Sequence, residues 1–326
     1  MENKNIMVYA ELDNGKVQSS ALELMSKARS LFTGDDVKIV YVTVGDDTKA
    51  AVEELSKAGA DAVYFCENAK LNIFNVDYFS AAVGEAIKMF NPDVVLMPAS
   101  TYGEELAPTV ALQFKTAGAA HCVDLVLRDN GEFVTHVPAF GGKVIGEILI
   151  PNTRPQIASI KPGLFTAEAL EAKDCEVIAV DPAVVDNTPS KIKAIEVVEK
   201  EPEGIPVEKA ELIVCGGFGV GSQENWDKLE ALAAKMGGTT GCTRPVVDEG
   251  WVPDDSKMIG TSGKGVRPKV YVGFGISGAA HHLCGMKDAG LIISVNSDGE
   301  APVFGASDYA VVGDGMPVVD ALLEKL

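Results

Sequence analysis

The stretch PKVYVGFGISGAAHHLCGMKDAGLIISVNSD, from Pro268 to Asp298, decides the fold of the C-terminal part of this chain. Its first residues favour a strand, and Gly273, Gly275 and Gly278 then fit the pattern G-x-G-x-x-G. A helix-forming segment follows and leads to a second apolar run. In a nucleotide-binding unit of this order, the glycines let the backbone approach a pyrophosphate at the start of the helix. The alternative is a glycine turn that only lets a helix pack close to a sheet.

The acidic residue Asp298 extends this pattern. It lies about twenty residues beyond the last glycine, where NAD-binding units place the carboxylate that binds the ribose. The pattern therefore indicates a dinucleotide but leaves its identity open.

Composition sets limits on the function. The 326 residues are 47% apolar and 23% charged, which is enough for two domains with sizeable cores. A net charge of −19 argues against nucleic acid or an anionic membrane as a partner. No run of about eighteen apolar residues predicts a membrane span, and the start resembles no targeting peptide, so we expect a cytoplasmic protein. The six cysteines show no C-x-x-C spacing, and the four histidines are few and dispersed apart from the adjacent His281 and His282, so we expect structural thiols and no metal site.

The N-terminal half alternates apolar and amphipathic segments. Between residues 5 and 100 this alternation predicts a parallel sheet with helices on both faces. We interpret the loop 98–103, at the end of a predicted strand, as a scaffold or subunit contact because it has no glycine cradle and no cation. Residues 132–160 predict hairpin strands added to the sheet, and residues 192–198 predict one further strand.

The expected architecture is α/β with two domains. Residues 1–198 form an amino-terminal parallel-sheet domain with added hairpin strands, and the charged, proline-bearing residues 199–208 form a linker. Residues 209–326 form a carboxyl-terminal Rossmann-like domain. A second glycine turn, at 216–222, leads into a helix and could also cradle phosphate through its N–H groups.

The sequence around the first glycine turn closely resembles a known family. Residues 275–314, GISGAAHHLCGMKDAGLIISVNSDGEAPVFGASDYAVVGD, resemble the FAD-binding segment of the electron transfer flavoprotein alpha subunit. The resemblance includes residues 216–226, 241–255 and 259–269, and it continues more loosely into the amino-terminal part.

The resemblance implies an electron carrier subunit that binds FAD and is not a stand-alone enzyme. Members of this family form a heterodimer with a beta subunit and exchange electrons with acyl-CoA dehydrogenases or related flavoenzymes, and some members bifurcate electrons. Two alternatives are an NAD-dependent oxidoreductase that uses the GFGISG turn and a flavin-free nucleotide-binding scaffold.

The resemblance also implies the roles of particular residues. Arg244 is expected beside the flavin ring, where a permanent positive charge favours added electron density. The alternative is a salt bridge to Asp248 or Glu249. His282 is expected to donate to the flavin C2 carbonyl oxygen, with His281 as a cofactor-side contact.

Further positions follow from the same comparison. Ser262 keeps the hydroxyl that the family places near flavin N5, whereas Thr261 stands in place of a glutamine. Phe218 stands where the family usually has arginine, so no binding role is expected for it. No catalytic residue and no metal ligand is expected. The complete set of expected FAD-binding residues is Thr243, Arg244, Gly260, Thr261, Ser262, Gly263, Ser277, Gly278, Ala279, Ala280, His281, His282, Asn296, Asp314 and Gly315.

Overall fold

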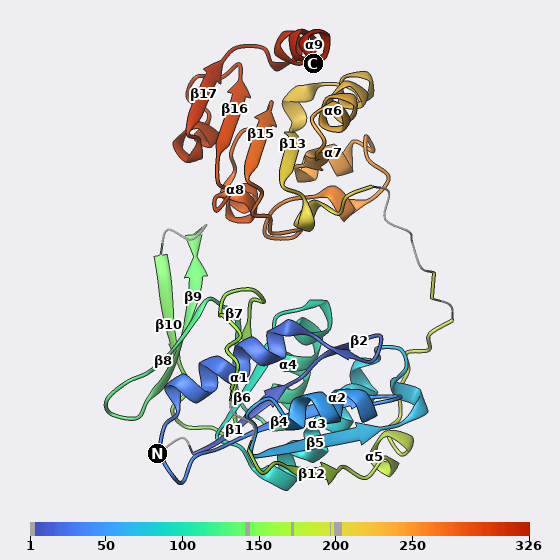
Figure 1. Ribbon diagram of the computed structural model, residues 1–326, viewed down its shortest axis with the longest axis vertical. Coiled ribbons are helices and arrows are strands. Elements are labelled where there is room, and N and C mark those ends of the chain that lie inside the picture. Colours follow the sequence, from blue (N-terminus) through green and yellow to red (C-terminus); the bar gives the residue numbers. More distant parts are fainter. Residues whose placement is uncertain (1–3, 141–143, 171–172, 196, 199–203) are drawn as a thin grey trace. The chain divides into compact units, whose positions relative to one another are not determined.

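The structure, a computed structural model, describes residues 4–140, 144–170, 173–195, 197–198 and 204–326 (Figure 1). The chain divides into two compact units, one within Met1–Ala139 and Lys143–Val197 and one that includes Val198–Leu326. Each unit has its own parallel sheet and its own core. Residues 199–203 of the expected linker lie outside the described residues, so the linker and the domain limits stay predictions.

The first unit is built on a parallel sheet, as its alternating pattern predicts. Within the described residues its strand order is β12-β5-β4-β1-β6-β11-β7, and every neighbouring pair is parallel. The strands are β1 (Asn5–Tyr9), β4 (Lys38–Gly45), β5 (Ala62–Glu67), β6 (Val94–Pro98), β7 (Gly118–Cys122), β11 (Gln156–Ile160) and β12 (Glu176–Ala179).

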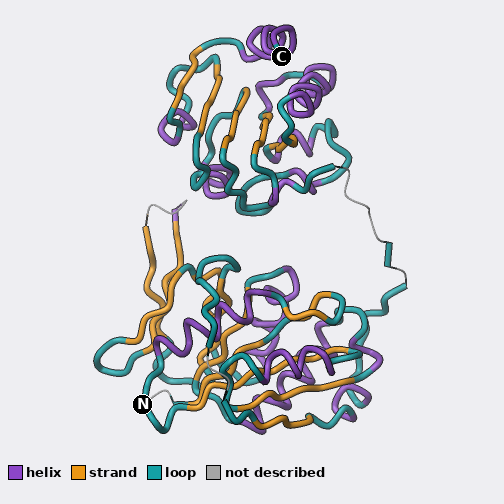
Figure 2. The backbone as a smooth tube through the Cα atoms, in the orientation of Figure 1, coloured by secondary structure: helices purple, strands orange, loops and turns teal. Residues whose placement is uncertain are grey.

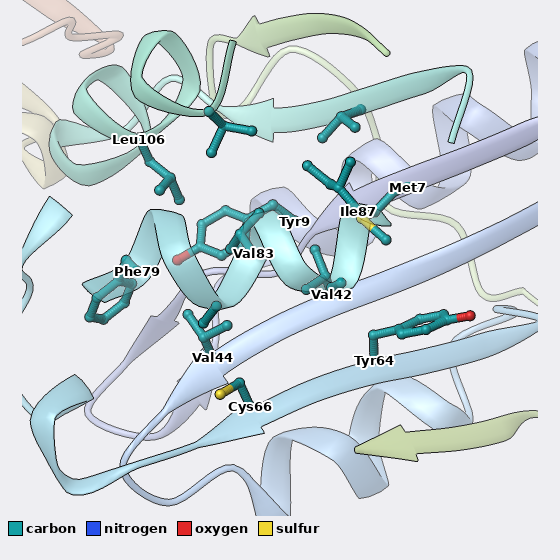
Figure 3. Packing of buried hydrophobic residues seen from close by; sticks show 14 of the residues in the cluster. Met7, Tyr9, Val42, Val44, Tyr64, Cys66, Phe79, Val83, Ile87 and Leu106 are labelled. Carbon is teal, nitrogen blue, oxygen red and sulfur yellow. The ribbon is translucent and has the colours of Figure 1, made fainter. Parts of the chain in front are cut away.

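Helices cover both faces of this sheet, so its central strands are apolar on both sides. Met7 and Tyr9 of β1 share a cluster with residues of α3 and α4 (Figure 3), whereas Ile6 and Val8 share one with residues of α1. The side chain of Asn75 accepts hydrogen bonds at the start of α3 and so caps it. The helices are α1 (Ser19–Leu31), α2 (Lys49–Ser56), α3 (Val76–Phe90), α4 (Thr101–Gln113) and α5 (Ala183–Asp186), with the 3₁₀ helix η1 (Ala69–Leu71).

The predicted hairpin is present but belongs to a separate antiparallel sheet. This sheet has the order β10-β9-β8 and consists of β8 (Asp124–Leu127), β9 (Phe133–Ala139) and β10 (Val144–Leu149). The turn expected at 140–142 lies partly outside the described residues. The short strands β2 (Leu12–Asp13) and β3 (Lys16–Val17) form one more antiparallel pair.

The strand expected at residues 192–198 is wrong for the described part of that segment. Residues 192–195, 197 and 198 are in no strand, and Ile195 is 94% exposed. The carbonyl oxygen of Ile192 instead accepts a hydrogen bond from the Asn75 side chain. Strand-like composition is a weak signal by itself, because a strand also needs a pairing partner, and these residues pair with no strand in the described part of the chain.

The second unit is a Rossmann-like parallel sheet with the order β14-β13-β15-β16-β17 (Figure 2). The chain runs from β13 outward to β14 and then returns to the other side of β13 as β15. The strand order therefore reverses between β13 and β15. Its strands are β13 (Leu212–Gly216), β14 (Thr239–Cys242), β15 (Val270–Phe274), β16 (Ile292–Asn296) and β17 (Tyr309–Val312).

Two apolar clusters hold this sheet between its helices. One joins α6, α7 and α9 to the sheet around the buried Trp226, and the other joins α8 to the opposite face around Tyr271. The helices are α6 (Gln223–Lys235), α7 (Arg244–Asp248), α8 (Ala280–Met286) and α9 (Gly315–Lys325), with the 3₁₀ helices η3 (Val207–Lys209), η4 (Phe218–Val220), η5 (Asp255–Lys257) and η6 (Pro302–Ala306).

In the described parts of both units, every helix is too short or too polar to cross a membrane. All six cysteines carry free thiols, and four of them, Cys66, Cys122, Cys215 and Cys242, are buried.

Candidate cofactor site

A cavity of about 470 Å³ lies in the second unit at the carboxyl ends of β13 and β15. This is the point where the strand order reverses, and open α/β sheets bind ligands at such points. Its volume falls within the roughly 300–1,000 Å³ usual for cofactor and ligand sites. The two glycine turns, the loop 258–263, the start of α7 and the region of α8 line it.

The second glycine turn supports the first one. Gly217 donates its N–H to Phe274 O at 2.9 Å, and Gly219 donates to Gly275 O at 3.0 Å. A Cβ at Gly217 would lie 2.4 Å from Gly275 O, so only glycine allows this approach. Because these amides already have acceptors, the phosphate cradle suggested for residues 216–222 is wrong for Gly217 and Gly219.

The first glycine turn, by contrast, leaves its amides open. Gly278 has φ +84°, and a Cβ there would lie 2.1 Å from the backbone nitrogen of Val303. In the part of the chain that the structure describes, the N–H groups of residues 277–281 have no protein acceptor. Five successive unpaired donors at the start of a helix form a site suited to an anion such as a pyrophosphate.

The loop 260–263 is fixed against α8 by backbone contacts. Thr261 donates its N–H and its hydroxyl to the carbonyl oxygen of His281, at 2.8 and 3.1 Å. A Cβ at Gly260 would lie 2.7 Å from the same oxygen, and a Cβ at Gly285 would lie 2.6 Å from Gly260 N. Ser262 is exposed at the cavity. The loop therefore presents Ser262 to the cavity, while the Thr261 hydroxyl bonds to the protein.

The adjacent histidines differ in environment. His282 is 6% exposed, with Nδ1 2.9 Å from Ile259 O and Nε2 2.8 Å from the Tyr271 hydroxyl. Burial lowers the pKa of His282, although the Ile259 carbonyl partly offsets this effect. Both of its ring nitrogens therefore have protein partners, and in this arrangement neither is free for the expected bond to a flavin carbonyl. His281 is exposed at the cavity.

Arg244 begins α7 at the edge of the cavity. Its Nε donates to Asp248 Oδ1 at 2.8 Å, which is one of the two salt bridges considered as an alternative role. This carboxylate raises the pKa of Arg244 above its already high ordinary value. The side chain is 64% exposed and lines the cavity, so the ion pair orients a permanent positive charge there.

Two polar residues that follow one another closely at the end of β16, Asn296 and Asp298, also line the cavity. Asn296 donates its side-chain N–H to Ile276 O at 2.8 Å, and its side-chain oxygen accepts from Asp298 N at 2.9 Å. Asn296 thus ties the end of β16 to the glycine turn. Asp298 also lines the cavity, and its carboxylate accepts from Glu300 N.

Most of the expected residues gather in this cavity, namely Thr243, Arg244, Gly260, Thr261, Ser262, Gly263, Ser277, Gly278, Ala279, His281, His282 and Asn296. Ala280, Asp314 and Gly315 are outside its lining. Asp314 caps α9 by accepting from Met316 N, which is the turn-forming role of its residue type.

Sequence reasoning missed several lining residues. Gly217, Gly219, Met258, Ile259 and Pro302 are among them. The glycine-rich turn was a signal for the first two, but their role in supporting another turn depends on tertiary contacts. Phe218 lines the cavity as well, with its ring stacked on Trp251 at a centroid distance of 6.4 Å.

Comparison with known proteins gives consistent similarities along the whole chain. Residues 6–185 match the electron transfer flavoprotein domain, and residues 206–287 match the electron transfer flavoprotein FAD-binding domain. The chain is 34% identical over 324 residues to the electron transfer flavoprotein subunit alpha of Thermoanaerobacterium thermosaccharolyticum, covering 99% of this chain and 98% of that protein. It is 32% identical over 323 residues to the protein FixB of Clostridium saccharobutylicum, covering 99% and 96%. It is 33% identical over 326 residues to the lactate dehydrogenase (NAD(+),ferredoxin) subunit LctC of Acetobacterium woodii, covering 99% and 77%.

Proposed function

This chain belongs to the electron transfer flavoprotein alpha-subunit family, and we propose that it holds one FAD in the cavity of its second unit and passes electrons through it. FAD, when bound, supplies the ring that accepts and releases the electrons. The chain supplies the binding contacts, the orientation of the ring and the surrounding charge.

The observation that carries this proposal is the row of unpaired N–H groups at residues 277–281. These N–H donors suit a negatively charged group such as the pyrophosphate of FAD. The positive end of the helix dipole of α8 favours an anion at the same place. The chain as a whole has a net charge of −19, so a bound anion depends on such local donors.

The ring of the cofactor would lie near Arg244 and the loop 260–263. A guanidinium there favours electron density on a nearby planar ring and can also stack on it. Ser262 would offer its hydroxyl from the loop, and Thr243, which is 8% exposed, lines the cavity directly before Arg244 in the chain.

The resemblance to the family also places Asn296 and Asp314 near the adenosine half of FAD, and fewer observations support this part of the site. Asn296 lines the cavity and holds the glycine turn, so we propose it as a contact there. Asp314 and Gly315 stay predictions, since they lie at the start of α9 outside the cavity lining.

Alpha subunits of this family pair with a beta subunit. We propose the finer assignment that the pair exchanges electrons with an acyl-CoA dehydrogenase or a related flavoenzyme in the cytoplasm. An NAD-dependent oxidoreductase is not favoured, because the residues matched to the FAD-binding domain include the GFGISG turn.

A second candidate function is that of a subunit in an electron-bifurcating complex. It is favoured by the relative whose name describes a subunit of a lactate dehydrogenase that uses NAD⁺ and ferredoxin. The two candidates differ in the flavin content expected of the complete pair.

Purification of the chain with its beta subunit tests the proposal. Size measurement should give a heterodimer, and absorbance should show FAD, with one FAD per pair for a simple carrier and two for a bifurcating complex. A chain truncated after Glu203 should retain none of the FAD that this chain binds. Full retention by that truncated chain would place the site in the first unit and refute the assignment.

A further inference from the structure

A second cavity, of about 730 Å³, lies in the first unit at the carboxyl ends of β1 and β4. Open α/β sheets bind ligands at such ends, and this volume is usual for small-molecule sites. The turn between β2 and β3, the loop before α2, the segment from η1 to α3 and the first turn of α4 complete the lining. Every lining residue belongs to the first unit, so this cavity is separate from the one proposed for FAD.

Tyr9, the last residue of β1, lines this cavity with a hydroxyl that has no partner. The residue is 1% exposed, and in the part of the chain that the structure describes no group forms a hydrogen bond with its hydroxyl. Figure 3 shows the hydroxyl directed to the side of Phe79, a buried residue that also lines the cavity. A buried hydroxyl without a partner costs free energy, so a ligand that hydrogen-bonds to Tyr9 would be favoured.

The charged groups of the lining are mostly acidic. They are four carboxylates and one ammonium group, those of Glu11, Asp13, Asp46, Asp47 and Lys16. Among the described residues, none of the four carboxylates has an ion-pair partner. In the same unit Asp61, by contrast, pairs with Arg29 at 2.7 Å and with Lys173 at 3.3 Å. The cavity would therefore attract a cation and repel an anion such as phosphate.

Glu11 is half-buried and is held in place at the cavity. Its Oε2 accepts a hydrogen bond from the hydroxyl of Ser100, which also caps α4 by accepting from Gly103 N at 2.9 Å. Oε1 has no donor in the described residues. Burial raises the pKa of Glu11, the Ser100 hydrogen bond partly offsets this effect, and the charge of Asp13 raises the pKa further. A positive group beside Glu11 would stabilise its charged form.

An aromatic pair forms another part of the lining. The rings of Phe74 and Tyr102 are stacked, with centroids 4.3 Å apart and planes at 12°, and Tyr102 is 43% exposed. The faces of such rings attract organic cations. In the described residues, no three Asp, Glu, His or Cys side chains converge where a metal ion could bind. The carboxylates of this cavity therefore suit an extended organic cation better than a single metal ion.

We propose that this cavity binds a small organic dication, in which an apolar chain joins two ammonium or guanidinium groups. One charged group would donate to the Tyr9 hydroxyl oxygen and to Glu11. The apolar chain would contact the aromatic lining, and the second charged group would meet the exposed carboxylates. The ligand undergoes no reaction here, and its binding does not depend on FAD in the second unit.

Calorimetric titration of the full chain, purified with its beta subunit, tests the proposal with diaminobutane as the probe. We expect saturable binding at about 0.15 M salt, where attraction to the overall net charge is largely screened. Butanediol of the same chain length is the uncharged control, and succinate is the anionic one. Neither should bind. Absence of saturable diaminobutane binding, or equal binding of butanediol, would overturn the proposal.

Two variants assign the binding to this cavity. Tyr9→Phe removes a hydroxyl that has no protein partner, so the chain should fold as before and bind diaminobutane about 3- to 10-fold more weakly. Glu11→Gln keeps the size of the side chain and removes its charge, so binding should weaken about tenfold or more. Asp129→Asn is the charge-matched control, because Asp129 is exposed between β8 and β9 and lies outside the lining.

The pattern across the three variants decides the outcome. Weaker binding in Tyr9→Phe and Glu11→Gln, beside wild-type binding in Asp129→Asn, would support the cavity. Equal weakening in Glu11→Gln and Asp129→Asn would show attraction to net charge alone, and unchanged binding in Tyr9→Phe would place the ligand away from the cavity floor. Either of these results would overturn the proposal. The FAD content of the pair should be the same in all three variants, so the test leaves the proposed function unaffected.

Discussion

Replacement of Gly278 by alanine should destabilise the second unit and weaken FAD binding together. Gly278 has φ +84°, a conformation that costs an L-residue about 1–2 kcal/mol. The new Cβ would lie 2.1 Å from Val303 N and 2.5 Å from Val303 Cα. Backbone atoms cannot rotate away, so relief of the overlap should cost about 1–3 kcal/mol more. The sum is about 2–5 kcal/mol of unfolding free energy.

The loss of stability can be measured in the second unit alone. The chain has two tryptophans, Trp226 and Trp251, and both lie in the second unit. Urea unfolding followed by tryptophan fluorescence therefore reports on that unit. The FAD content of the purified heterodimer is measured in parallel, because the strained turn also carries the unpaired N–H groups.

Gly305→Ala is the matched control. Gly305 lies in η6 near the same turn, its φ is not in the left-handed region, and an added Cβ there would meet nothing within 4 Å. It should change stability by no more than about 0.5 kcal/mol. If Gly278→Ala behaves like Gly305→Ala in both stability and FAD content, the reasoning about the glycine turn is wrong.

Three further predictions follow from individual contacts. Arg244→Ala should lower the first reduction potential of the bound FAD and Arg244→Lys should restore part of it, whereas an unchanged potential in a reductive titration would leave only the ion pair with Asp248 as its role. Tyr271→Phe should remove the hydroxyl that lies 2.8 Å from His282 Nε2 and cost about 1–3 kcal/mol in the same tryptophan assay; an unchanged free energy of unfolding would contradict this contact. Burial alone would raise the pKa of Asp61, but the Ile39 N–H and Arg29 lower it overall, so its stabilisation is present above its ordinary pKa of 3.8 and is lost as the pH falls below it. Asp61→Asn should flatten that acid-induced loss, measured by circular dichroism, and an unchanged pH profile would count against the contact.

The sequence predicted those parts of the fold that depend on local pattern. The central strands of both units are short apolar runs followed by amphipathic helices, so their order alone indicated parallel sheets. Pairing partners depend on distant residues. The hairpin of β9 and β10 was therefore expected, but its separate sheet with β8 was not. Residues 192–198 had a strand-like composition, but their described part pairs with no strand.

In the candidate site, too, the sequence predicted what depends on local pattern and not what depends on tertiary contacts. The glycine pattern located the turn at 275–278, and the similarity to a known family added the loop 260–263 and Arg244. The two glycine turns have similar sequences, yet the N–H groups of Gly217 and Gly219 donate to carbonyl oxygens at the other turn. This difference depends on tertiary contacts, so the sequence could not indicate it. Helical spacing likewise indicated that His281 and His282 face opposite sides, but it could not indicate which side is buried.

The most direct test of the central claim is the absorbance spectrum of the chain purified with its beta subunit, together with the amount of FAD released on denaturation. We predict a flavin spectrum and FAD in a fixed ratio to the pair, with the FAD held by this chain lost in Gly278→Ala and retained in Gly305→Ala. A colourless pair that binds NADH, or a flavin content that Gly278→Ala leaves unchanged, would contradict the assignment of FAD to this cavity.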